Sequence, residues 1–389
     1  MTFQAETIHI SCANDMLKTE EMIDFIKTRY EKTLAQHLNI VKVSAPVVVP
    51  DGTGINDDLS GVEKPISFPI KSLDGQKASI IQSLAKWKRM RLRYFHIEPG
   101  KGILTDMRAL RPSENLSPIH SVYVDQWDWE KHILPEQRTL KFLKSTVEQL
   151  YKTIRITEDE LFQKYPWLTP QLPPFITFIH SEELYKMYPG LPPKERENEA
   201  AKKFKAIFII GIGNVLSDGK PHDLRAPDYD DWSTKNEDGY FGLNGDILFW
   251  NSNLNSAFEI SSMGIRVDKT AMEKQLEISN CQDRKKLLFH KLLLEGQLPL
   301  RRILPKRRTS QKLIILEQPR IVDQLLRHRA RRSRGENAVE GRLGGPAPET
   351  VAVAQRDVVQ LEFAQPQTRA LLQRPDARTQ AAQRHAAPR

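Results

Sequence analysis

Hydrophobic residues recur at the three-to-four-residue spacing of an amphipathic helix in several parts of the chain. Between residues 19 and 38 the recurring positions are Met22, Ile23, Ile26, Tyr30, Leu34 and Leu38. The same spacing predicts helices over residues 140–154 and 197–205. We expect each helix to pack against the rest of the fold through its apolar face.

Alternating or β-branched runs predict strands between and after these helices. The runs cover residues 40–49, 119–130, 206–210, 246–250 and 257–265, and residues 80–92 indicate a short strand that leads into a basic helix. Pro46 lies inside the first run, which predicts a sheet edge or an interface because proline has no N–H to donate to a ladder. Since helices and strands do not alternate regularly, the pattern favours an α+β domain with an antiparallel sheet over a doubly wound fold.

The distribution of charge divides the chain of 389 residues near residue 300. Residues 301–389 hold 17 Arg, 2 Lys and 8 acidic residues, a net charge of +11, whereas residues 1–300 carry a net charge of −2. The segment 301–389 also has a single aromatic residue, Phe363. We therefore expect a folded domain over 1–300 and an Arg-rich tail over 301–389, whose low hydrophobic density resembles that of disordered sequence.

Clustered arginines can bind nucleic acids or membrane surfaces by releasing counterions from phosphates. The arginines of this tail are spaced irregularly and have no interleaved aromatic residues, a pattern more typical of a solvated segment. We therefore expect no nucleic-acid partner.

The sequence has the features of a soluble protein. No apolar run approaches the roughly 18 residues that a membrane span requires, so we expect no membrane partner. The two cysteines, Cys12 and Cys281, are too few for the disulfide framework of a secreted protein. A cytoplasmic location, in a reducing compartment, is the resulting expectation.

Several common nucleotide and catalytic motifs are not found in the sequence. It has no G-x-x-x-x-G-K-[ST], so any use of ATP would not depend on a P-loop. Gly211 and Gly213 follow an apolar run, but the third glycine position of a dinucleotide fingerprint is Leu216. The histidines show no H-E-x-x-H spacing, and there is no G-x-S-x-G nucleophile elbow.

Polar side chains line one face of the strand predicted to end at Glu130. Period-two geometry places Gln126, Asp128 and Glu130 on one face and Trp127 and Trp129 on the other. Three polar side chains in a row are costly in a dry core and natural in a pocket. The alternative is a solvent-facing sheet edge, since antiparallel sheets often wet one face.

Acidic residues mark two further candidate sites. The segment 225–232 (RAPDYDDW) places three carboxylates beside two aromatic residues, either in a binding loop or in a solvated acidic loop. Asp246 and Glu259 lie on neighbouring predicted strands, where they can share a divalent cation with a phosphate group. Arg111 is suited to bind a phosphate in bidentate fashion, although its spacing alone favours a surface ion pair.

Longer strings around these residues resemble known enzymes. Residues 111–114 (RPSE) followed by 120–130 (HSVYVDQWDWE) resemble the second motif of class II aminoacyl-tRNA synthetases, and the helix followed by the Pro46 strand is similar to their first, dimer-forming motif. The strings that are similar to those of the ammonia-dependent asparagine synthetases, or aspartate-ammonia ligases, are 57–61 (DDLSG), 83–89 (SLAKWKR), 225–233 (RAPDYDDWS), 242–246 (GLNGD) and 261–266 (SSMGIR).

This resemblance runs from about residue 20 to about residue 300 and implies a fold and a reaction. The fold is a class II synthetase-like antiparallel sheet flanked by helices, in a homodimer. The reaction makes L-asparagine from L-aspartate, ammonia and ATP through a β-aspartyl-adenylate, with release of AMP and pyrophosphate. The implied partners are therefore L-aspartate, ammonia and ATP, and the implied cofactors are ATP and Mg²⁺.

The resemblance also implies a role for each residue of the candidate site. Arg111 would hold the α-phosphate, with Glu114 and His120 also at the ATP, and Asp246 and Glu259 would hold Mg²⁺. Asp57 would take a proton from ammonium or hold the ammonia in line. The residues that would orient the amino acid are Lys88, Gln126, Asp128, Asp230, Ser262 and Arg266.

Two related kinds of enzyme would need other features. A glutamine-dependent synthetase uses an N-terminal cysteine nucleophile, whereas position 2 is Thr, so free ammonia is the expected nitrogen source. An aspartyl- or asparaginyl-tRNA synthetase would need an anticodon-binding domain, commonly before the first motif. Because Pro46 comes early in this sequence, we expect no such domain before the first motif.

The chain departs from the family after residue 300. Family members continue into a G-G-G-x-G-x-x-R motif, whose arginine stacks on the adenine, whereas residues 301–308 read RRILPKRR and 341–345 (GRLGG) are no substitute. We therefore interpret the domain over 1–300 as truncated before the third motif and the tail over 301–389 as frame-shifted or recombined. The alternative to an active ligase is then a catalytically silent homologue that dimerises or binds ligand without turnover.

Overall fold

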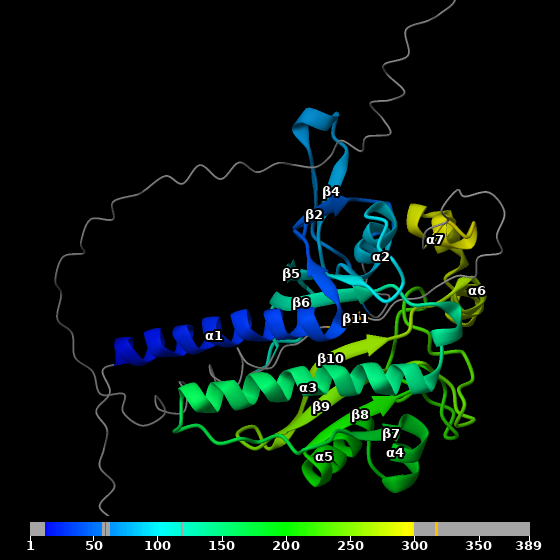
Figure 1. Ribbon diagram of the computed structural model, residues 1–389. Coiled ribbons are helices and arrows are strands. Elements are labelled where there is room, and N and C mark those ends of the chain that lie inside the picture. Colours follow the sequence, from blue (N-terminus) through cyan, green and yellow to red (C-terminus); the bar gives the residue numbers. More distant parts are fainter. Residues whose placement is uncertain (1–11, 57–58, 60–62, 118–119, 299–315, 318–389) are drawn as a thin grey trace, which may run out of the picture. The chain divides into compact units, whose positions relative to one another are not determined.

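A computed structural model describes residues 12–56, 59, 63–117, 120–298 and 316–317 (Figure 1). All of these residues lie in the same structural unit. Asp57 lies outside the described residues, and so does nearly all of the predicted tail over 301–389. Within the described part, no helix is long and apolar enough to cross a membrane.

Two long helices run side by side: α1 (Cys12–Leu38) and α3 (Leu140–Lys164) (Figure 1). The predicted apolar face of α1 is buried, with Leu34 and Leu38 fully inaccessible to solvent. Thr139 caps α3 by accepting a hydrogen bond from the Phe142 N–H (3.1 Å). Both predicted helices are confirmed, and α3 continues beyond the predicted range.

The first sheet has the strand order β1-β5-β6-β11. Antiparallel pairing joins β5 to β6 over their whole length, and β1 pairs with β5 in parallel. Leu316 and Glu317, the described residues of the predicted tail, pair with Glu130 and Trp129 of β6. The strands are β1 (Ile40–Lys42), β5 (Gly102–Leu110), β6 (Tyr123–Lys131) and β11 (Leu316–Glu317).

The second sheet has the strand order β10-β9-β8-β7. Its pairs are antiparallel except for the parallel pair of β7 and β8. The register of β10 on β9 shifts between Glu259 and Ser261, as in a β-bulge. The strands are β7 (Thr177–His180), β8 (Ala206–Ile210), β9 (Asn244–Asn251) and β10 (Ser256–Gly264).

The prediction of a single strand over 40–49 is wrong, because part of this segment belongs to a third, small sheet. That segment forms two short strands in different sheets, β1 and β2 (Val48–Pro50), and Pro46 lies in the link between them. Because proline cannot donate to a ladder, the chain changes sheets at this point. The partners of β2 in the small sheet are β4 (Lys77–Ile80) and then β3 (Ser67–Pro69).

Five shorter α-helices and three short 3₁₀ helices complete the described part of the fold. The α-helices are α2 (Ala85–Tyr94), α4 (Ser181–Met187), α5 (Pro193–Phe204), α6 (Lys269–Ile278) and α7 (Leu288–Leu294). Short 3₁₀ helices are η1 (Lys71–Leu73), η2 (Pro135–Gln137) and η3 (Gln282–Lys286).

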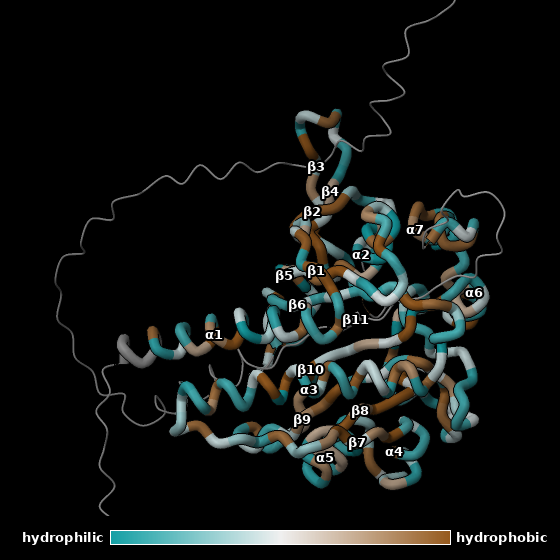
Figure 2. Tube along the Cα trace, viewed as in Figure 1, coloured by the Kyte–Doolittle hydropathy of each residue, from teal (hydrophilic) through white to brown (hydrophobic). Residues whose placement is uncertain are grey.

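The largest hydrophobic cluster joins α1, α3 and both main sheets. It includes Leu34 of α1, Leu150 of α3, Trp129 of β6 and Phe208 of β8, all fully buried. Figure 2 shows β8 as hydrophobic along its whole length, in keeping with its buried sequence AIFII. Because Trp127 and Trp129 occupy this core, the polar face of β6 is turned away from it.

Candidate active site

The polar face of β6 is buried and does not form a solvent-facing edge. Gln126 is 1% exposed, and Asp128 and Glu130 are fully buried. Helix α2 packs against β6. The period-two prediction for this strand is therefore confirmed, and polar groups of β6 lie in the interior of the protein.

Helix α2 supplies basic side chains to this face. Near the start of the helix, the Ser83 hydroxyl accepts a hydrogen bond from the Ala85 N–H (3.2 Å). One turn further, the fully buried Lys88 forms an ion pair with Asp128. Burial lowers the pKa of Lys88 and raises the pKa of Asp128, while their mutual attraction opposes both shifts.

Arg266 connects the loop after β8 to the same strand. Its guanidinium pairs with Asp230 and lies 3.4 Å from both carboxylate oxygens of Glu130. The side chain is 1% exposed. Four residues predicted to orient an amino acid therefore share one buried network: Lys88, Asp128, Asp230 and Arg266.

The network gathers charges of both signs in one buried site. Lys88 and Arg266 pair with the carboxylates of Asp128, Glu130 and Asp230. Two further arginines add positive charge: the buried Arg89 acts on Glu130, and Arg111 acts on Asp128. Cations and carboxylates side by side are the groups that the two charged ends of an amino acid require.

Arg111 lies just beyond the end of β5. It is 6% exposed, and its Nε donates a hydrogen bond to the Gln82 carbonyl (3.2 Å). Arg111 is close enough to Asp128 to lower the pKa of that carboxyl, against a larger effect of burial. Glu114 and His120 lie in the following turn, where both are partly exposed.

Asp246 and Glu259 come from the paired strands β9 and β10. Asp246 lies opposite Ser262 in the register, and it forms an ion pair with Arg225. Burial, followed by the charge of Glu259, raises the pKa of Asp246 to about 7, although Arg225 opposes this. A site with two mutually repelling carboxylates fits Mg²⁺, which takes oxygen ligands and relieves the repulsion.

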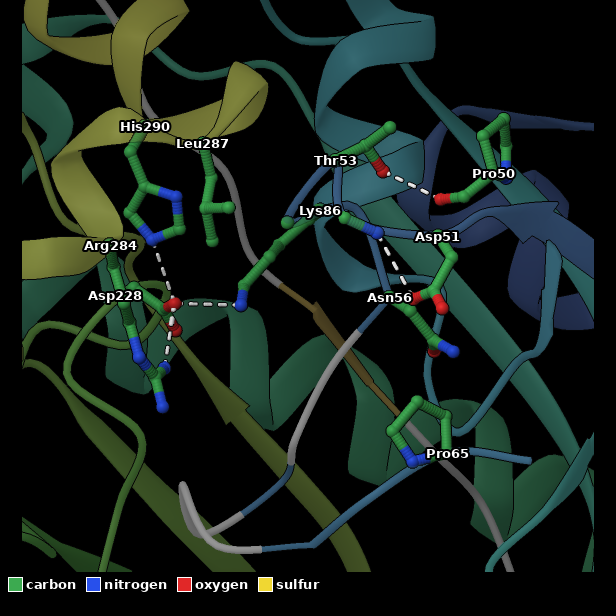
Figure 3. A pocket seen from close by; sticks show the side chains of 12 residues that line it. Pro50, Asp51, Thr53, Asn56, Pro65, Lys86, Asp228, Arg284, Leu287 and His290 are labelled. Carbon is green, nitrogen blue, oxygen red and sulfur yellow. Dashed lines mark hydrogen bonds and ion pairs between the residues drawn. The ribbon is translucent and has the colours of Figure 1, made fainter. Parts of the chain in front are cut away.

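A carboxylate with three basic partners lies at a cavity of about 160 Å³ (Figure 3). Asp228 Oδ2 is 2.7 Å from Lys86 Nζ, 3.0 Å from Arg284 Nη1 and 2.9 Å from His290 Nε2. Burial opposes ionisation of Asp228, but these partners outweigh it and lower its pKa. The opposite wall of the cavity is the loop 50–56, which precedes Asp57.

Sequence reasoning missed several members of these clusters. Lys86, Arg225 and Asp228 lie inside the strings that carried the resemblance, but no spacing rule distinguishes them from their neighbours. Arg284 and His290 lie in segments for which no helix was predicted. Among the described residues, no group of three or more His, Cys, Asp or Glu forms a metal site.

The ionisation of Glu130 gives a testable pH dependence. Burial raises its pKa from 4.5 to about 7, although Arg266 and Lys88 oppose the shift. The folded state keeps this proton up to about pH 7, whereas the unfolded state releases it near pH 4.5. The free energy of unfolding should therefore fall as the pH rises between these two values. Glu130 should account for about 2–3 kcal/mol of this fall. Urea denaturation of the wild type and Glu130→Gln, from about pH 5 to about pH 8, measures the difference.

Asp246 titrates in the same window, so the comparison with Glu130→Gln isolates one group. The variant cannot ionise at this position and should show a flatter profile than the wild type. Parallel profiles for the two proteins would mean that Glu130 does not carry the shift.

Comparison with known proteins identifies the family. The family model for aspartate-ammonia ligase matches residues 17–302. An aspartate--ammonia ligase of Parabacteroides distasonis is 50% identical over 285 residues, which cover 73% of this chain and 83% of that protein.

Solved structures agree with this chain in fold. The asparaginyl-tRNA synthetase of Pyrococcus horikoshii, complexed with asparaginyl-adenylate, superposes with a TM-score of 0.54 at 15% identity and covers 82% of this chain and 67% of that one. That of Entamoeba histolytica, also with asparaginyl-adenylate, gives a TM-score of 0.53 at 12% identity over 81% of this chain and 66% of that one. The chain thus spans about two thirds of these synthetases and shares their class II fold. From its sequence and its family match, the chain belongs to the aspartate-ammonia ligase family.

Proposed function

We propose that this protein makes L-asparagine from L-aspartate, ammonia and ATP. The β-carboxylate of aspartate attacks the α-phosphate of ATP, which releases pyrophosphate and leaves a β-aspartyl-adenylate. Ammonia then attacks the activated carbonyl, and AMP leaves. The observation that supports this best is the buried network of Lys88, Asp128, Glu130, Asp230 and Arg266, in a chain of this family.

The charges of the network suit the two ends of an amino acid. Lys88 and Arg266 are the cations available to an α-carboxylate, and Asp128 and Asp230 are the anions available to an α-ammonium group. Both kinds of contact strengthen in a site that excludes water. Gln126 lies on the same face of β6 as Asp128, and Ser262 lies opposite Asp246. We assign these two neutral polar side chains to aspartate as well.

The phosphate end of the site is assigned to Arg111. A planar guanidinium can donate two parallel hydrogen bonds to a phosphate and neutralise charge as it develops on the oxygens. We place Glu114 and His120 at the same nucleotide. Asp246 and Glu259 would hold Mg²⁺, which supplies charge neutralisation on the phosphates when bound.

The nitrogen substrate is assigned to the segment that begins at Asp57. A carboxylate there would accept a proton from ammonium, or hold ammonia in line with the activated carbonyl. We further propose that residues 1–300 are the catalytic domain, that it works in the cytoplasm, and that two copies associate through α1 and the segment around Pro46.

Product formation tests the proposed function. The full-length chain, supplied with L-aspartate, ammonium and MgATP, should release pyrophosphate and form L-asparagine in equal amounts. Without ammonium, pyrophosphate release should stop near one equivalent per site, because the adenylate is not consumed. Binding of ATP or aspartate without any pyrophosphate would instead identify a silent homologue.

A further inference from the structure

Arg225 is a largely buried arginine of the site to which the proposed roles above assign no task. It belongs to the loop between β8 and β9, and its guanidinium forms the ion pair with Asp246. Its side chain is 14% exposed, and among the described residues its Nε has no hydrogen-bond partner. Within this part of the chain, the guanidinium forms an ion pair with one carboxylate and has a donor to spare.

The surrounding backbone makes room for this side chain. A Cβ at Gly213 would lie 3.0 Å from the Cβ of Arg225 and 2.8 Å from Cγ of Trp232. Gly213 also has a φ of 113°, a conformation that side chains rarely adopt. Glycine at this position lets the stem of Arg225 pass along the loop toward Asp246.

The charges around Arg225 keep it positive. Burial disfavours its charged form, but Asp246, Asp230 and Glu259 outweigh burial and raise its pKa. The guanidinium thus supplies positive charge to the pair of carboxylates, Asp246 and Glu259, that fits a divalent cation.

A cation bound by Asp246 would compete with this ion pair. Two positive charges at neighbouring positions in a buried site repel each other unless an anion lies between them. The phosphates of ATP carry such negative charge, and they arrive with the metal in MgATP. An arginine released from Asp246 would then meet a phosphate with its forked donors.

We propose that the metal ion displaces Arg225 from Asp246. The Arg225 guanidinium neutralises Asp246 before MgATP binds, and the side chain then moves to contact the triphosphate. This inference rests on the proposed roles of Asp246 and Glu259. The metal and the nucleotide should then bind cooperatively. A metal ion that binds alone breaks the Arg225–Asp246 ion pair, and no phosphate is present to pair with the released arginine. Removing Arg225 should therefore strengthen the binding of metal alone and weaken the binding of MgATP.

Equilibrium binding to the full-length chain tests both halves without turnover. Mn²⁺ binding in the absence of nucleotide is measured by the electron paramagnetic resonance of free Mn²⁺, and MgATP binding by calorimetry without aspartate. Arg225→Gln should bind Mn²⁺ about tenfold more tightly and MgATP about tenfold more weakly than the wild type. Arg225→Lys keeps the charge and loses the fork, so both of its changes should be smaller and of the same sign as those of Arg225→Gln.

The matched control removes another positive charge that acts on Asp246. The charge of Lys194 acts to lower the pKa of Asp246. Lys194 itself pairs with Glu197 (3.1 Å), and its side chain is 70% exposed. Lys194→Gln should change both affinities by less than about threefold. The inference is overturned if Arg225→Gln binds both Mn²⁺ and MgATP more weakly than the wild type, or if its affinity for Mn²⁺ is unchanged. If Arg225→Gln does not fold, the same comparison is made with Arg225→Lys. If the variants differ from the wild type in Mn²⁺ and MgATP binding as expected, but the wild type makes no asparagine, only the proposed function is refuted.

Discussion

Replacing Arg111 with lysine should lower the rate of pyrophosphate release by about 10²–10³-fold. Lysine keeps the charge but cannot form two parallel hydrogen bonds to a phosphate. It also cannot donate to the Gln82 carbonyl from the position of the Arg111 Nε and reach a phosphate at the same time. We expect the loss in kcat to exceed any change in the KM for aspartate, because the contact strengthens as charge develops on the phosphate. Steady-state assays of pyrophosphate release measure both constants.

Arg108, near the end of β5 and three residues before Arg111, provides the matched control. Its side chain is 56% exposed and lies 3.9 Å from Asp106, so Arg108→Lys should leave the rate within about twofold of the wild type. Thermal unfolding of both variants would show that β5 remains intact. A rate for Arg111→Lys within threefold of the wild type would remove this residue from the phosphate site.

Replacing Arg266 with glutamine should lower the free energy of unfolding by about 3–5 kcal/mol. Glu130 and Asp230 would then remain in the interior without the guanidinium that now contacts both. The variant should also lose measurable binding of L-aspartate, since the remaining charges of the network repel the α-carboxylate. Urea denaturation gives the stability, and calorimetry gives the binding.

A second substitution separates the two causes of this instability. In Arg266→Gln combined with Glu130→Gln, one uncompensated carboxylate is gone, so part of the lost stability should return. Aspartate binding should stay lost in the double variant. If Arg266→Gln is destabilised by less than about 1 kcal/mol, the ion pairs of Arg266 do not stabilise the fold as the distances indicate.

The elements that were predicted well have local causes. β8 occupies the residues that its apolar run predicted, Ala206–Ile210, because a fully buried strand reads as a continuous hydrophobic segment. The buried polar face of β6 followed from alternation alone, since Trp127 and Trp129 fixed which face meets the core. The α+β class followed from the irregular order of helices and strands.

Other elements depend on contacts between distant segments. β5 was not predicted, because Asp106 and Arg108 interrupt its apolar residues and only pairing with β6 makes it a strand. Helices α6 and α7 were also missed, as were α4 and β7, all of which are short. The change of sheet at Pro46 depends on which strand each half meets, and proline alone does not specify that partner.

The same distinction holds for the site. The resemblance supplied the residues of the network, but not the facts that Lys88 meets Asp128 across α2 and β6, or that Arg266 joins Asp230 to Glu130. No pattern in the sequence predicts the pairing of Arg225 with Asp246 or the three partners of Asp228. Asp57 stays a prediction, because it lies outside the described residues.

Helix α2 carries two lysines with different tasks, and this limits how the enzyme can be redesigned. Lys88 reaches Asp128, while Lys86, two residues earlier, holds Asp228 together with Arg284 and His290. Any redesign that shifts α2 to admit a longer dicarboxylic amino acid would also draw Lys86 away from Asp228, the carboxylate that Arg284 and His290 contact as well. With the proposed role of Lys88, selectivity for the length of the amino acid is tied to the contacts of Asp228, and a broader substrate range would have to come from side chains outside α2.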